Sequence, residues 1–245
     1  MALAVSGCGA ALTAAPSTAA KTYSATVLAD GPVAYWRMDE TSGSTMADAS
    51  GHANNGRYAG AYALGQTGAI AGDGNTAVGF DGQSGAASVV NSTTLQVNTI
   101  TIEIWINKKT DTEYGAYVAK NFEGGGGAGS GWFQLVNSHH DGRLEFRVTS
   151  DGAPAVVSRS TFALNTWYYV VATYDGTVAR LFVNVKLDSS LKVTALPKQT
   201  ADPLFIGRRT DGLFNNALVD EVAIYPVALS ADRIAAHWRA ASGKP

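Results

Sequence analysis

Two short stretches of the chain alternate between apolar and polar positions, which is the pattern of a β-strand with one face on a core. In TIEIWIN (101–107) three isoleucines fall on one face, while Glu103 and Trp105 fall on the other. In RLEFRV (143–148) leucine, phenylalanine and valine share one face, and three charged residues share the opposite face. Both stretches are therefore predicted to be strands that turn their aliphatic face inward.

A third stretch, WYYVVATY (167–174), is apolar at both alternating sets of positions, as expected for a central strand of a two-layer sandwich. It ends at Asp175–Gly176, a dipeptide typical of tight hairpin turns, and ARLFVNV (179–185) follows as the return strand. Two further strands are predicted at PLFIG (203–207) and LVDEVAIY (218–225).

Helical signal is confined to the C-terminal end of the chain. Ser230 is a good N-cap residue, and Asp232 in the first turn favours the positive end of the helix dipole. Ile234 and Trp238, four residues apart, would pack on one face against the sheets. The patterns together predict an all-β fold, an antiparallel two-sheet jelly-roll sandwich with one short C-terminal helix.

Composition narrows the functional classes. The 245 residues include 18 Lys and Arg and 20 Asp and Glu, for a net charge of −2, which gives no electrostatic reason to bind nucleic acid or an anionic membrane. No apolar run reaches the about 18 residues of a membrane-spanning helix. Cys8 is the only cysteine, so an intramolecular disulfide is excluded.

The first 22 residues differ in composition from the remainder. We predict an Ala/Thr/Ser-rich arm over 1–22 and one domain over 23–245. VSGC at Cys8 is similar to a bacterial lipobox, but no cationic segment precedes it, and the seven residues before Cys8 are fewer than a secretory leader needs. Lipid anchoring through Cys8 would therefore require an earlier start codon, and the alternative is an arm without lipid.

Five segments, in order, resemble the bacterial laminin-G-like, concanavalin A-like jelly-roll family. They are AYWRMDETSGSTMADASGHANNGRY (34–58), VGFDGQSGAASV (78–89), ITIEIWIN (100–107), NTWYYVVATYDGTVARLFVN (165–184) and VDEVAIYPVALSADRIAAHW (219–238). The resemblance implies the same sandwich and a surface-recognition role. The chain departs from the family at Asn184–Val185, where Asp-Gly is usual, and at Ala217, where Gly is usual.

The segment YSATVLADGPVAYWRMDE (23–40) is also similar to the openings of laminin-G-like minor tail proteins of actinobacterial phages. This resemblance implies an extracellular or virion-surface location, with the arm as a contact to other virion proteins or to another copy of the chain.

The acidic residues do not show a catalytic pattern. A retaining glycosidase needs two carboxylates about 5–5.5 Å apart that face one cleft. Asp220 and Glu221 are consecutive, so in a strand they are expected to point to opposite faces, with Glu221 toward solvent or an arginine. Glu103 is the only acid in its strand, and the four histidines lack metalloprotease spacing. We therefore expect no enzymatic activity.

The resemblance also implies a structural calcium ion that joins the N-terminal segment to an aspartate of the closing strand. By position that residue is Asp220, with Asp39 or Asp48 as partners, and carboxylate oxygens are the ligands that calcium prefers. The alternative is that Asp220 binds backbone amides of an adjacent turn.

Ligand-binding candidates are aromatic and polar residues near loops, because sugars stack on aromatic faces and bind polar groups at their edges. Tyr114, Tyr117 and Trp132 border one glycine-rich loop, although Trp132 also fits the start of a core strand. A second set comprises Arg208, Arg209 and Asp211.

Three functions remain open from the sequence. The first is a non-catalytic module that recognises glycans or a host cell surface from a phage virion or a cell exterior. The second is a purely structural virion protein, and a secreted or lipid-anchored bacterial surface protein is a variant of the first. A glycoside hydrolase is the third.

Overall fold

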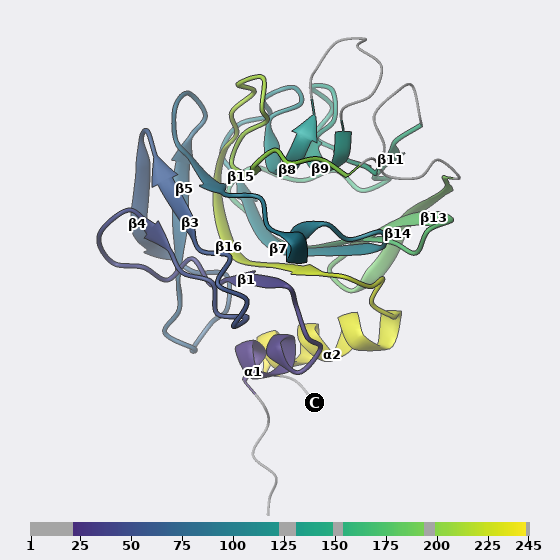
Figure 1. The fold of residues 1–245 in the computed structure, drawn as a ribbon, viewed down its shortest axis with the longest axis horizontal. Helices are drawn as coiled ribbons and strands as arrows, with labels where there is room; N and C mark the ends of the chain where they lie inside the picture. Colours follow the sequence, from purple (N-terminus) through teal and green to yellow (C-terminus); the bar gives the residue numbers. More distant parts are fainter. Residues whose placement is uncertain (1–21, 123–130, 149–153, 194–198, 244–245) are drawn as a thin grey trace, which may run out of the picture.

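The computed structural model describes residues 22–122, 131–148, 154–193 and 199–243. Over these residues the chain forms two antiparallel sheets of eight strands each, stacked face to face, with two helices on one side (Figure 1). The all-β sandwich with a short C-terminal helix that the sequence predicts is confirmed. Residues 1–21, with Cys8, lie outside the described part, so the boundary between arm and domain stays a prediction.

Sheet A carries the segments whose alternation was clearest in the sequence. In spatial order its strands are β14 (Lys186–Lys192), β13 (Val178–Val183), β12 (Trp167–Tyr174), β7 (Ile100–Lys108), β16 (Asn216–Tyr225), β5 (Thr76–Asp81) and β4 (Tyr62–Thr67), with β1 (Ala34–Trp36) paired to β16. Strand β7 lies between β12 and β16, and both of its faces are buried along its whole length.

Sheet B faces the inner side of sheet A. Its strands are β11 (Val156–Val157), β10 (Leu144–Arg147), β9 (Gly131–Asn137), β8 (Ala116–Phe122), β15 (Leu204–Ile206), β6 (Ala86–Val89), β3 (Gly56–Ala59) and β2 (Thr45–Met46). A single 3₁₀ turn, η1 (Thr93–Leu95), follows β6.

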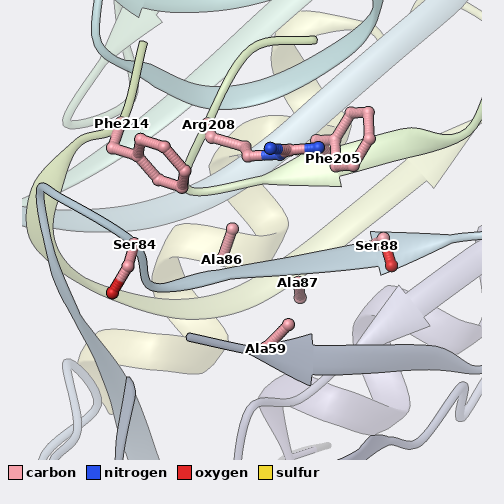
Figure 2. A pocket seen from close by; sticks show the side chains of 8 residues that line it. All are labelled: Ala59, Ser84, Ala86, Ala87, Ser88, Phe205, Arg208 and Phe214. Carbon is pink, nitrogen blue, oxygen red and sulfur yellow. The ribbon is translucent and has the colours of Figure 1, made fainter. Parts of the chain in front are cut away.

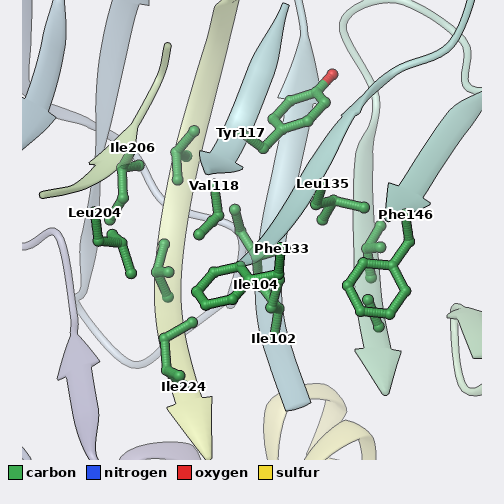
Figure 3. Close-up of a cluster of buried hydrophobic side chains, with 14 of the residues drawn as sticks. Ile102, Ile104, Tyr117, Val118, Phe133, Leu135, Phe146, Leu204, Ile206 and Ile224 are labelled. Carbon is green, nitrogen blue, oxygen red and sulfur yellow. The ribbon is translucent and has the colours of Figure 1, made fainter. Parts of the chain in front are cut away.

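The main core fills the space between the sheets. Ile102 and Ile104 of β7 and Ile224 of β16 face Phe133 of β9 and Leu204 of β15 across this space (Figure 3). All five side chains are buried, and for Ile102 and Ile104 this confirms the inward face predicted from alternation. Dense packing of aliphatic side chains from both layers provides most of the driving force for folding.

A second apolar cluster lies on the outer face of sheet A, beneath the helices α1 (Tyr23–Leu28) and α2 (Ala231–Ser242) (Figure 1). Helix α2 begins after the N-cap Ser230 as predicted, and Trp238 stacks on Trp105 of β7 with 5.5 Å between ring centroids. Helix α1 was missed by the sequence analysis, which found helical signal only at the C-terminal end of the chain. Its N-cap, Thr22, accepts a hydrogen bond from the Ala25 amide.

Beneath both helices, a buried carboxylate receives four hydrogen bonds. Glu103 accepts from the hydroxyls of Tyr23 and Tyr169 at 2.7 Å each, from Tyr225 at 2.8 Å, and from Nδ1 of His237 at 2.8 Å. Burial alone would raise the pKa of Glu103, but these contacts, His237 first, hold it below the usual range. Glu103 is therefore a scaffold anchor that ties both helices to β7.

His237 is held between two acids, because its Nε2 atom lies 2.9 Å from Asp30, which also binds Arg233. Burial lowers the pKa of His237, but the hydrogen bond and charge of Glu103, and then Asp30, raise it above the ordinary value. Two carboxylate neighbours require both ring nitrogens to donate, so His237 is an imidazolium in the folded protein.

Among the described residues, none of the helices has the length and apolar character needed to cross a membrane.

The turn at Asn184–Val185, where the family usually has Asp-Gly, is formed with φ of 46° and 72°. The hairpin of β13 and β14 is thus retained, although valine rarely adopts this backbone conformation.

The imidazolium predicts a pH dependence of stability. Because the folded-state pKa of His237 is raised, its contribution is fully present below about pH 6.5, the unfolded value, and is lost as the pH rises through the folded value. The free energy of unfolding of the wild type should fall with rising pH in this range, and the His237→Gln variant should show a smaller fall. Urea unfolding of both proteins at a series of pH values measures this; equal slopes would contradict the charged state of His237.

Candidate functional site

Two of the expected ligand-binding aromatic residues lie in the core. Tyr117 and Trp132 are fully buried, and the Tyr117 hydroxyl donates to Asn137 at 3.0 Å. The structure thus assigns both side chains to packing, the alternative that the sequence left open for Trp132. Tyr114 remains half-buried at the surface, where its hydroxyl lies 3.2 Å from His139.

The acid pair does not follow regular strand geometry. The register of β16 against β7 shifts between Asp220 and Ala223, and Glu221 has a φ of 54°. This β-bulge turns both carboxylates toward Asn75, whose amide nitrogen donates to Asp220 at 2.9 Å and to Glu221 at 2.8 Å. The expectation that they point to opposite faces was wrong, because it assumed an unbroken strand.

Glu221 was expected to face either solvent or an arginine, and the structure does not place it in solvent. It is fully buried, accepts a hydrogen bond from the Tyr35 hydroxyl, and lies 3.7 Å from the Arg37 guanidinium. Burial raises its pKa, and the charge of Asp220 raises it further. Burial likewise raises the pKa of Asp220 to about 7, although the Ala69 amide, at 2.8 Å, opposes the rise.

The expected partners of Asp220 for a calcium ion are engaged elsewhere. Asp48 accepts hydrogen bonds from the backbone amides of Tyr35, Ser50 and Asn54, and Asp39 pairs with Arg37 at 3.2 Å. Within the part of the chain that the structure describes, no three His, Cys, Asp or Glu side chains are grouped so as to hold a metal ion.

The side chains of Asp220 and Glu221 meet at the amide nitrogen of Asn75, which donates to both carboxylates. The Asn75 side chain is buried, and its Oδ1 atom has no hydrogen-bond partner among the described residues. Two buried carboxylates that share one amide donor offer oxygen ligands of the kind that a hard cation prefers.

A surface pocket of about 170 Å³ lies on the outer face of sheet B (Figure 2). Its floor consists of small side chains from β3 and β6, and its rim carries aromatic and cationic side chains from β15 and the loop that follows. The lining residues are Ala59, Ser84, Ala86, Ala87, Ser88, Phe205, Arg208 and Phe214.

Strand alternation positions the aromatic wall. Leu204 and Ile206 point into the core, so Phe205 between them points outward, opposite Ser88 of β6. The Arg208 guanidinium lies over the Phe205 ring, 4.2 Å from its centroid, and 5.6 Å from that of Phe214 (Figure 2). Both distances are within the range of cation–π attraction.

Backbone and side-chain contacts within the loop hold Arg208 and Phe214 in place. The two residues form a β-bridge, and the Arg209 amide donates to the Leu213 carbonyl at 3.1 Å. The buried Arg209 side chain binds Asp211 at 2.6 Å. Of the second predicted set, Arg208 therefore lies at the pocket, whereas Arg209 and Asp211 hold the loop that presents it.

One glycine allows this loop to leave β15 at the required angle. Gly207 has a φ of 88°, and a Cβ atom there would lie 2.8 Å from the Phe80 ring. Any other residue would have to displace a core aromatic side chain, so Gly207 fixes the direction in which Arg208 departs.

Phe205, Phe214 and the small residues of the floor were missed by the sequence analysis. PLFIG was interpreted only as a strand, yet its own alternation, with Phe205 between two inward aliphatic residues, is a signal for an outward aromatic side chain. Phe214 and the floor residues gave no such signal, because their meeting depends on how β3, β6 and β15 pair.

A family model for the concanavalin A-like lectin/glucanases superfamily, of laminin G type, matches residues 80–235. The chain belongs to this superfamily. No curated protein sequence matches the chain significantly.

Solved structures show the same fold at low sequence identity. The Trypanosoma rangeli sialidase in complex with sialic acid has a TM-score of 0.62 at 15% identity, over 85% of this chain and 32% of the sialidase. The binding domain of botulinum neurotoxin DC in complex with SialylT has 0.63 at 14%, over 88% and 52%. The serotype D binding domain has 0.64 at 17%, over 86% and 52%. The chain thus spans about half or less of these structures, and the likeness is one of fold.

Proposed function

We propose that the chain is a non-catalytic carbohydrate-binding module whose ligand occupies the pocket on sheet B. The observation that carries this is the arrangement of Phe205, Arg208 and Phe214 above a floor of small side chains. Aromatic faces pack against the apolar C–H groups of a sugar ring, while a guanidinium and hydroxyl groups bind its polar edge.

The size of the pocket favours a single sugar ring. About 170 Å³ is smaller than the about 300–1,000 Å³ typical of pockets for drug-sized ligands. An open pocket of this size suits a terminal sugar unit of a longer glycan, with affinity increased when several copies bind one surface.

The placement of the acids supports a binding role over hydrolysis. Glu103, Asp220 and Glu221 are fully buried and bound to neighbouring side chains, and none of them lines the pocket. The fold by itself does not decide, because its neighbours include a sialidase as well as binding domains. Sialic acid and SialylT in two of those structures are consistent with a glycan ligand for this one.

We place the module on a phage virion or a cell exterior, with a host cell surface as its partner. The support is the resemblance of residues 23–40 to openings of phage minor tail proteins, together with the lectin-like fold. Antibodies against the chain, applied to purified phage particles and to intact cells, test this location, and labelling of neither would contradict it.

We also propose a structural calcium ion at the bulge in β16. Asp220 and Glu221 would hold it, beside the Asn75 amide that donates to both, in place of the set with Asp39 and Asp48 that the sequence suggested. A bound ion would neutralise two buried carboxylates and brace β16 against the segment before β5.

Removal of the aromatic rim should weaken glycan binding. Phe214→Ala removes the half-exposed ring at the mouth of the pocket, and we expect signals on a glycan array of neutral and acidic sugars to fall about fivefold or more, because aromatic contacts contribute about 1 kcal/mol each. Thermal unfolding of the variant should stay close to that of the wild type.

Arg239→Ala is the matched control for substitutions at the pocket. Arg239 is exposed on α2, which packs on the outer face of sheet A, away from the pocket (Figure 1). The Arg239→Ala variant should bind glycans as well as the wild type does. Unchanged binding by a folded Phe214→Ala protein would place the glycan site elsewhere, and absence of any signal with the wild type would refute the proposed function.

Calcium should raise the melting temperature of the wild type. At a hundredfold excess over its dissociation constant, calcium should add about 2.7 kcal/mol to the free energy of unfolding. Asp220→Asn should abolish this rise, whereas Asp48→Asn should lower the melting temperature yet retain the calcium response, since Asp48 binds only its own turn and Tyr35. Differential scanning calorimetry with calcium or chelator measures both. Loss of the response in Asp48→Asn alone would contradict the donor set.

A further inference from the structure

We propose that the pocket on sheet B selects acidic saccharides, with the carboxylate of the sugar bound by the Arg208 guanidinium. This inference rests on the proposed carbohydrate-binding function and specifies its ligand class: a sugar ring that bears a carboxylate, such as a uronic acid.

The first argument is the state of Arg208. Among the described residues it has no hydrogen-bonded or ion-paired carboxylate, although it is held against Phe205 and Phe214. A guanidinium that stacks through its face keeps its N–H groups directed outward in its plane, and these match the two oxygens of a carboxylate. Stacking also restricts the side chain before the ligand arrives, which reduces the entropy lost on binding.

The second argument is that the nearby acids are bound to other groups and therefore do not neutralise Arg208. Asp211, in the same loop, binds the buried Arg209. Asp81 precedes the turn that contains Ser84 and accepts hydrogen bonds from three backbone amides at 2.7 to 3.0 Å. Burial raises the pKa of Asp81, but these hydrogen bonds outweigh it and hold the pKa at about 2. Both charges are thus bound within their own loops.

The third argument is a second cation on the same face. Arg57 of β3 pairs in register with Ser88, and cross-strand partners share a face of the sheet. Arg57 is exposed and has no ion pair among the described residues. The outer face of β3, β6 and β15 therefore has a positive local potential, although the chain as a whole carries a charge of −2.

The pocket distinguishes a sugar acid from other anions through its remaining groups. The Ser88 hydroxyl has no hydrogen-bond partner in the described part of the chain, so it is free to bind a ring hydroxyl. The half-buried Phe214 offers an apolar face that a bare phosphate or an acidic peptide side chain would not use. A ring with both a carboxylate and hydroxyl groups matches all of these features.

Glucuronate and glucose make a suitable pair of probes, because they differ only by a carboxylate in place of a hydroxymethyl group. NMR titration of the full chain should give a dissociation constant about 10- to 100-fold lower for glucuronate, the factor expected for charge-assisted hydrogen bonds. Arg208→Gln should remove this preference, and Arg208→Lys should restore it only in part, since lysine lacks the planar fork. Arg239→Gln is the charge-matched control and should keep the preference.

The outcomes separate this inference from the proposed function. Equal binding of glucuronate and glucose, or an acid preference that persists in Arg208→Gln, would overturn the inference and leave the carbohydrate-binding function standing. A short polyglutamate peptide that binds as well as glucuronate would show a general anion site and would also overturn it. If neither these sugars nor any array glycan binds the wild type, the proposed function itself fails.

Discussion

The buried carboxylate of Glu103 holds two helices on the outer face of sheet A. It lies in the middle of β7, on the outward face of sheet A, where an unpaired charge beneath two helices would be strongly unfavourable. Three tyrosine hydroxyls and the His237 imidazolium satisfy it, and these donors come from α1, β12, β16 and α2. Removal of one partner from such a buried pair typically costs about 3–5 kcal/mol, so helix docking and sheet pairing depend on each other.

This anchor has a consequence for function. Because α1 and α2 pack over the apolar cluster around Trp105, Tyr169 and Tyr225, that part of the outer face of sheet A contributes stability (Figure 1). The outer face of sheet B, at β3, β6 and β15, keeps small side chains and a pocket. The aromatic and cationic groups of the candidate site accordingly come from β15 and the loop after it.

The sequence was most informative where side-chain alternation alone determines the outcome. TIEIWIN, WYYVVATY and the helix after Ser230 obey local rules, and the structure has all three as predicted. Helix α1 was missed because its six residues carry little periodicity, and its position depends on a hydrogen bond from Tyr23 to Glu103, eighty residues away. The bulge at Asp220 was missed for a related reason, since it shows only in the register between β16 and β7.

The candidate site follows the same division. Arg208 was found from its loop position, but Phe205 needed the face assignment of β15, and the floor needed the pairing of β3 with β6. Tyr117 and Trp132 failed as surface residues because neighbouring strands cover them, which sequence distance from a glycine-rich loop does not show.

On the proposed function, the net charge of the chain does not predict the charge of the ligand, and the positions of the acidic residues explain why. Of its 20 acidic residues, Glu103, Asp220 and Glu221 lie in the interior, where neighbouring side chains donate hydrogen bonds to them. Asp81 and Asp211 are bound within their own loops, whereas Arg208 and Arg57 lie on the outer face of sheet B. A nearly neutral chain can thus present a locally cationic pocket, and ligand charge is set by which acids the fold buries and not by how many it has.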